Sequence, residues 1–184
     1  MQIRLSIVSA AALALAACGS NDDAAPAADD TATADVAAEP AAPDATTAQG
    51  FTDTVAASDM YELEAAKLAQ EMGTGEKVKA FAAMMATDHT KSSADLKAAA
   101  GESDPPVTVA PALTAKQQGD LDALRSAGDN FDTVYAQQQV AAHEQALALL
   151  QAYGADGDSA PLKAFATATA MVVEHHLDEA RTLP

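Results

Sequence analysis

Histidine is scarce in this sequence of 184 residues, and its positions suggest metal chemistry. The four histidines are His89, His143, His175 and His176. Three of them, His89, His143 and His176, continue apolar stripes with the three-to-four-residue spacing of a helix that buries one face. One imidazole from each of three helices would then point into a shared interior. Because imidazole and carboxylate groups bind zinc, iron, manganese or copper, the pattern predicts a transition-metal site.

Acidic side chains complete the predicted site. Glu62 shares the apolar face of its segment with Val55 and Ala69, each seven residues away, and is the predicted fourth ligand. Other polar side chains near the histidines could orient the metal-binding rings through hydrogen bonds. The candidates for this supporting role are Asp88, Glu144, Glu174, His175 and Tyr135.

A second pattern is typical of copper in particular. Met85 precedes His89 by four residues, and Met171 precedes His175 by four, so each pair shares a helix face. A thioether beside an imidazole suits copper. Methionine also fills apolar cores, and a histidine on an apolar stripe can be a core residue with one satisfied hydrogen bond. A purely structural role for these residues therefore stays open.

Four long helical segments would have to position these side chains. The apolar periodicity predicts helices over residues 51–72, 75–100, 129–153 and 159–181. A short link joins the first helix to the second, and another joins the third to the fourth, so each of these two pairs should be antiparallel. A longer, proline-containing link, 101–113, separates the two pairs. The sequence thus predicts an all-α four-helix bundle of two helical hairpins, with an extra short helix before the third long one.

Local signals mark several helix ends. Thr74 and Asp129 stand where N-caps are expected, and Gly154 stands where the third long helix is expected to end. The run Thr114–Gln117 matches a capping box and predicts a short helix that ends near residue 127. Pro161 falls in the first turn of the last helix, where proline is tolerated.

The N-terminal residues resemble a bacterial lipoprotein signal peptide, predicted over residues 1–17. A short basic start precedes an apolar run too short to span a bilayer, and the run ends at Leu15-Ala16-Ala17-Cys18. Acylation of Cys18, the only cysteine, would attach the protein to the membrane. The residues after it, Gly19 and Ser20, favour the outer membrane, with the protein facing the periplasm. An ordinary signal peptide with an incidental cysteine is the alternative.

Residues 18–50 are predicted to be a disordered tether, and residues 51–184 the folded domain. The stretch after Cys18 consists mainly of Ala, Asp, Thr and Pro, carries seven acidic residues and no basic one, and has little apolar surface to bury. Its composition gives no indication of chemistry.

The composition argues against several function classes. The formal charge of −17 opposes nucleic-acid binding, which needs a basic surface. The chain has no G-x-S-x-G, H-E-x-x-H or P-loop motif, so little in it supports catalysis. A metal-binding module is the first interpretation, a non-catalytic structural or partner-binding envelope protein the second, and a ferritin-like redox enzyme the third.

Residues 51–183 resemble a bacterial envelope family, the domain of unknown function 4142. The runs that carry this resemblance are Met60–Glu64, Val78–Ala82, Asp88–Lys91, Phe131-Asp132 with Tyr135, and Glu174–Leu177. The resemblance implies a ferritin-like four-helix bundle in the periplasm or at the outer membrane. Ferritin-like di-iron sites use Glu-x-x-His, which this chain lacks, so di-iron chemistry does not follow from the fold.

Overall fold

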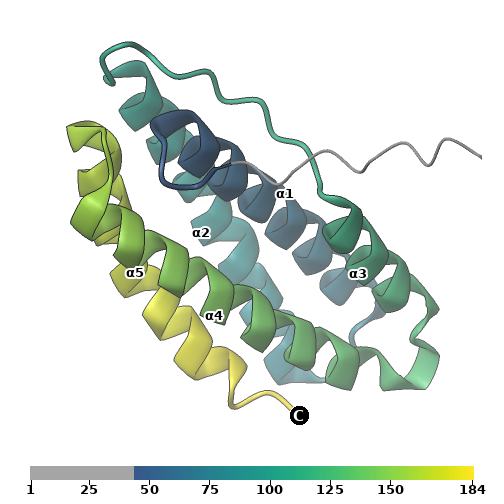
Figure 1. The fold of residues 1–184 in the computed structure, drawn as a ribbon. Coiled ribbons are helices and arrows are strands. Elements are labelled where there is room, and N and C mark those ends of the chain that lie inside the picture. The colour runs from purple at the N-terminus through teal and green to yellow at the C-terminus, as the bar shows by residue number, and fades with distance from the viewer. Residues whose placement is uncertain (1–43) are drawn as a thin grey trace, which may run out of the picture. The chain divides into compact units, whose positions relative to one another are not determined.

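The computed structural model describes residues 44–184, and the regular secondary structure of this part of the chain is helical, without a strand (Figure 1). The elements are α1 (Ala48–Met72), α2 (Glu76–Gly101), α3 (Ala115–Ser126), the 3₁₀ turn η1 (Gly128–Asn130), α4 (Phe131–Asp156) and α5 (Ala160–Ala180). The predicted all-α helical bundle is confirmed. Among the described residues, none of the helices is long and apolar enough to cross a bilayer.

The four long helices pack most closely in sequential pairs. α1 lies along α2, and α4 lies along α5, while α2 meets α5 and α1 meets α4 over smaller areas. The short α3 packs against α1 and α4. The link between α2 and α3 returns along the outside of α1, where Gln49 donates a hydrogen bond to the Thr108 carbonyl at 2.9 Å (Figure 1).

Some helix starts follow the sequence signals and others do not. The Thr114–Gln117 capping box forms as predicted, and the Thr114 hydroxyl accepts from the Gln117 backbone amide. α1 begins at Ala48, three residues before the predicted start, because Thr47 caps the Gly50 amide. Thr74 is not the N-cap of α2: Gly75 takes that position, and the Thr74 hydroxyl donates to Asp132 instead.

The boundaries of α4 also differ from expectation. Asp129 lies in η1 and caps nothing, since α4 begins at Phe131. Gly154 does not end the helix, which continues to Asp156. A Cβ atom at Gly154 would lie 3.0 Å from the Thr167 hydroxyl of α5, so this glycine permits the close approach of two helices rather than stopping one.

A polar layer divides the core into two apolar clusters. The first contains Phe81 and Tyr135, and the second contains Phe51, which stacks on Tyr153 with ring centroids 3.9 Å apart. Between them along the helices lie buried polar side chains: Asp59, Glu62, His89, Gln139, His143 and His176. The layer places six hydrogen-bonding side chains at the level where a bundle is normally apolar.

Asp132 ties the start of α4 to the turn between α1 and α2. Its carboxylate accepts from the Thr74 amide and hydroxyl and from the Gly75 amide, at 2.7–3.0 Å. Partial burial favours the protonated acid, but these hydrogen bonds and the charge of Lys79 outweigh it and lower the pKa of Asp132.

We expect Asp132→Asn to lower the stability of the protein by about 1 kcal/mol at pH 7, because one backbone amide loses its acceptor. A group with a lowered pKa stabilises the folded state above its ordinary pKa of 3.8 and loses that contribution below it. The difference in melting temperature between variant and wild type should therefore shrink as the pH falls below 4. A difference that stays constant down to pH 2.5 would contradict this interpretation.

The predicted signal peptide, Cys18 and the tether up to residue 43 lie outside the described residues. Their predicted roles remain expectations.

Candidate metal centre

Three helices each contribute one histidine to the polar layer. His89 comes from α2, His143 from α4 and His176 from α5, and they are 7%, 2% and 1% exposed. Their ring centroids lie 5.5–5.9 Å apart. All three side chains therefore point into the bundle interior, as their helical phase predicts. Their rings also lie at the same depth along the bundle.

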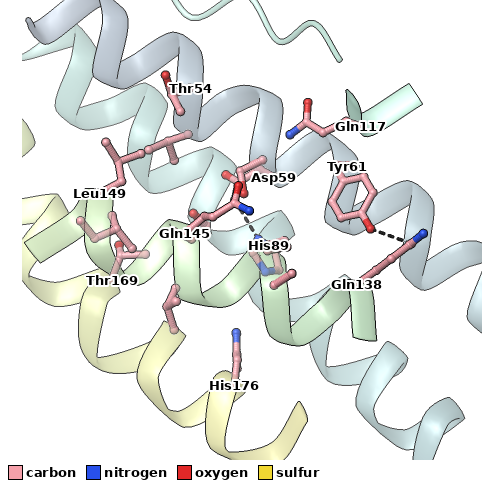
Figure 2. Close-up of a pocket in the computed structure, with 18 of the residues that line it drawn as sticks. Thr54, Asp59, Tyr61, His89, Gln117, Gln138, Gln145, Leu149, Thr169 and His176 are labelled. Carbon is pink, nitrogen blue, oxygen red and sulfur yellow. Dashed lines mark hydrogen bonds and ion pairs between the residues drawn. The ribbon is translucent and has the colours of Figure 1, made fainter. Parts of the chain in front are cut away.

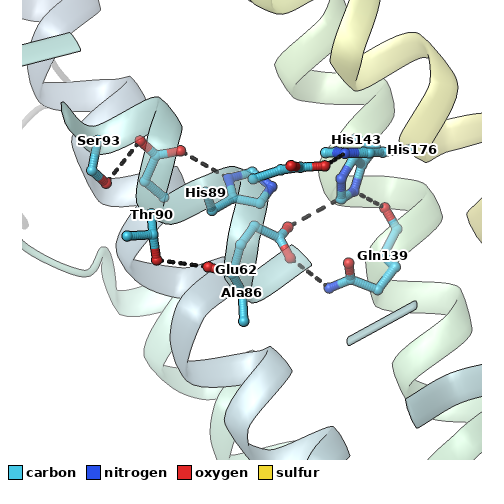
Figure 3. A network of polar contacts seen from close by, with 10 residues as sticks. Glu62, Ala86, His89, Thr90, Ser93, Gln139, His143 and His176 are labelled. Carbon is cyan, nitrogen blue, oxygen red and sulfur yellow. Dashed lines mark hydrogen bonds and ion pairs between the residues drawn. The ribbon is translucent and has the colours of Figure 1, made fainter. Parts of the chain in front are cut away.

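Each ring has one nitrogen held by an oxygen acceptor. His143 Nδ1 lies 2.8 Å from the Gln139 carbonyl oxygen (Figure 3). A carbonyl only accepts, so His143 Nδ1 carries the proton, and in the neutral ring Nε2 keeps its lone pair. His89 Nδ1 lies 2.8 Å from an Asp59 oxygen, and His176 Nε2 lies 2.9 Å from an Asp88 oxygen. The carboxylates fix the tautomers of these two rings in the same manner.

The second nitrogen of each ring is buried and makes no hydrogen bond among the described residues. These atoms are His89 Nε2, His143 Nε2 and His176 Nδ1. The three histidines offer ligand atoms that all lie within 4.8 Å of one another. Nitrogen ligands of a tetrahedral zinc ion are about 3.3 Å apart, a spacing that small side-chain rotations can reach. Three imidazole nitrogens without a partner among the described residues fit a transition-metal ion, which would displace any proton that they carry.

Charge in the layer differs from ring to ring. Burial lowers the pKa of His176 to about 4, although Asp88 opposes this effect, and burial also lowers the pKa of His143. These two rings are neutral at pH 7 and ready to bind a cation. Burial acts on His89 too, but its hydrogen bond to Asp59 and the charges of Asp59, Glu62 and Asp88 outweigh it, so the pKa of His89 is raised.

Glu62 is buried beside the histidine cluster rather than within it. One of its oxygens accepts from Gln139 Nε2 at 2.8 Å, and the other lies 3.9 Å from His143 Nδ1, the nitrogen already bound to a carbonyl. Tyr135, a predicted supporting residue, is fully buried with a hydroxyl that has no partner among the described residues. Burial, with the negative charge of Glu62, raises its pKa. Tyr135 packs against Phe81 and Phe131 in the first apolar cluster, and its hydroxyl makes no hydrogen bond to a histidine among the described residues.

The other predicted supporting residues fall into two groups. Asp88 contacts His176 as described above. Glu144, Glu174 and His175 are exposed on α4 and α5, and Glu144 accepts a hydrogen bond from Arg181 at the surface. The structure therefore does not bring these three to the free ring nitrogens.

Sequence reasoning missed Asp59. This residue is 3% exposed, binds His89 and also accepts from the Ser93 hydroxyl at 3.1 Å (Figure 3). Asp59 lies three residues before Glu62 and hence on the same helix face, and that spacing was the available signal.

An open groove reaches the cluster from the surface. It lies between α1 and α4, has a volume of about 440 Å³, and includes His89 and His176 in its wall (Figure 2). Its size falls within the range of small-molecule sites in proteins.

A protein-family model, Domain of unknown function (DUF4142), matches residues 31–183 of this chain. The chain belongs to the DUF4142 family. The match agrees with the resemblance seen in the sequence. The description of the DUF4142 family names no activity. A comparison with curated proteins finds no match.

A solved structure described as "CopM in the Cu(I)-bound form" is similar to this DUF4142 chain in fold. The TM-score is 0.61 with 16% sequence identity, over 73% of this chain and 93% of that one. A likeness at this level of identity shows a shared helical fold alone.

Proposed function

We propose that this protein binds one transition-metal ion through His89, His143 and His176. The observation that carries the proposal is that three buried histidines offer ring nitrogens within 4.8 Å of one another. Each ring has one nitrogen without a partner among the described residues, while its opposite nitrogen is held by an oxygen. Asp59, Asp88 and the Gln139 carbonyl orient the rings and make the ligand nitrogens more basic. Glu62 adds a buried negative charge next to the ion.

The donor set favours zinc or copper over iron or manganese. Imidazole is a good ligand for zinc, copper and iron, whereas manganese prefers oxygen ligands. For a given nitrogen site, the affinity for divalent ions increases from manganese through iron to copper. The similar fold of a protein described as Cu(I)-bound makes copper a specific candidate to test. Met85, one helical turn before His89, is buried in the first apolar cluster and could add a thioether near this site.

The test is metal binding by the full chain, purified without a histidine tag. We expect one equivalent of zinc or copper to bind wild-type protein in equilibrium dialysis, with weaker binding of iron and manganese. The His143→Ala/His176→Ala variant should lose this equivalent and keep its helical circular dichroism. If no ion among the four binds tightly, the histidines are structural, and the second interpretation, a partner-binding protein, replaces this one.

We also propose how the helices are arranged and where in the cell the protein is located. The close pairing of α1 with α2 and of α4 with α5 supports two helical hairpins in a ferritin-like arrangement. A signal peptide and acylated Cys18 would anchor the bundle to the envelope, facing the periplasm.

Membrane attachment should depend on Cys18. The negative charge of the chain opposes binding to anionic lipid, so Cys18→Ala should move the protein from the membrane to the soluble fraction of a cell extract. A matched Ser20→Ala variant should stay with the membrane. Recovery of Cys18→Ala in the membrane fraction would refute lipid anchoring.

A further inference from the structure

The groove between α1 and α4 gives the metal centre a solvent-facing side. Its wall contains side chains from all four long helices, and His89 and His176 lie at its base (Figure 2). α1 and α4 pack less closely than the helices of either sequential pair, which leaves room for this opening. A small molecule in the groove would therefore reach two of the three proposed ligands.

The proposed ligand set leaves a coordination position free. Three imidazoles supply the clustered nitrogens, whereas Glu62 is bound to Gln139 and faces the hydrogen-bonded nitrogen of His143. Zinc sites with three protein ligands keep a fourth position for water or another exogenous ligand. The groove is the open side from which such a ligand can enter.

The lining of the groove indicates the chemistry of that ligand. The lining combines an apolar part, here called the apolar half, which includes Val55, Ala146, Leu149 and Val172, with uncharged polar side chains such as Gln117, Gln138 and Gln145. The acidic residues of the lining, Asp59, Asp88 and Asp120, outnumber its one cation, Lys116, which is paired with Asp120. Apolar walls favour an apolar body, and adjacent carboxylates disfavour an anion.

We infer that the groove binds a small neutral molecule with a nitrogen or sulfur donor on an apolar body, the donor occupying the fourth position of the bound ion. This inference rests on the proposed metal site. It assigns the centre a role in ligand binding rather than simple ion storage.

The experiment uses the full chain loaded with Co²⁺, whose visible absorption reports its coordination. Titration with 4-phenylimidazole should change the spectrum with 1:1 stoichiometry. We expect it to bind about tenfold tighter than imidazole, the factor provided by burying roughly 60 Å² of phenyl ring. Azide, a small anion, should bind more weakly than imidazole.

A matched pair of substitutions on α4 tests the location. Ala146→Phe fills the apolar half of the groove and should abolish the preference for 4-phenylimidazole over imidazole. Ala148→Phe, on the exposed side of the same helix, should keep it. Dialysis should show that both variants retain Co²⁺.

The outcomes separate this inference from the proposed function. Failure of Co²⁺ to bind would refute the metal centre itself. Bound Co²⁺ with a spectrum that none of the probes changes would refute the inference alone and indicate that Glu62 takes the fourth position. Tighter binding of azide than of imidazole would overturn the assigned ligand class.

Discussion

Replacement of His176 by alanine should remove metal binding, whereas the same replacement of the adjacent His175 should leave it intact. The two residues differ in environment: His176 is 1% exposed and belongs to the cluster, and His175 is exposed on α5. Loss of a residue that only orients a ligand weakens metal affinity about 10- to 100-fold. Loss of a ligand should exceed that range.

His176 is the best of the three positions for this substitution. Its partner Asp88 has a side chain that is 36% exposed, so water can solvate the carboxylate when the ring is removed. The partner of His89, Asp59, has a side chain that is 4% exposed and would become an unpaired buried charge. A loss of metal binding in His89→Ala could therefore not be distinguished from a loss of folding.

Thermal unfolding provides the readout. A ligand present at 100 times its dissociation constant stabilises the folded state by about 2.7 kcal/mol, so zinc or copper should raise the melting temperature of wild type and His175→Ala by several degrees. His176→Ala should show no rise. An equal rise in His176→Ala would exclude this residue as a ligand.

The substitution Asp59→Asn should weaken metal affinity about 10- to 100-fold without unfolding the protein. Asparagine has the size of aspartate and can still accept a hydrogen bond from His89, but it lacks the charge that favours a metal-bound imidazole. Asp53→Asn, six residues earlier on α1, is the control and should bind metal as the wild type does.

The same variant should change how metal binding depends on pH. Because Asp59 raises the pKa of His89, wild-type protein keeps a proton on this ring above pH 6.5, and a metal ion must displace it. Wild-type affinity should rise with pH above that value. In Asp59→Asn, burial dominates and lowers the pKa of His89, so the dependence should flatten near neutrality. A parallel shift of the two curves would show that Asp59 does not control the protonation of His89.

Without metal, the His89–Asp59 pair should have the opposite effect on folding. A histidine with a raised pKa stabilises the folded state fully below its unfolded value of 6.5, and this contribution is lost as the pH rises through the folded pKa. Metal-free and metal-loaded protein should consequently differ most in stability at alkaline pH.

Helical periodicity predicted the inward direction of the three histidines but not their common depth. Direction follows from spacing along one helix, so His89, His143 and His176 could each be assigned to an interior face from the sequence. Depth depends on how far the helices slide past one another, and that is a property of tertiary packing. The partners of the rings were harder to predict, because Asp59 comes from a segment without histidine.

The errors at helix ends have a similar cause. Thr74 and Gly154 are typical of helix boundaries, yet Thr74 binds a side chain 58 residues away and Gly154 makes space for α5. Both residues serve contacts between segments. By contrast, the Thr114–Gln117 capping box is complete within four residues, and it formed as predicted.

The polar layer between the two apolar clusters has a further consequence, for the alignment of the helices. Sliding one helix by a single turn, about 5.4 Å, would move its histidine or carboxylate into an apolar cluster and away from its partner. An uninterrupted core rich in alanine would tolerate such a shift much better, since one small side chain would replace another. We therefore expect the layer to select one register among the helices, even in protein that carries no metal.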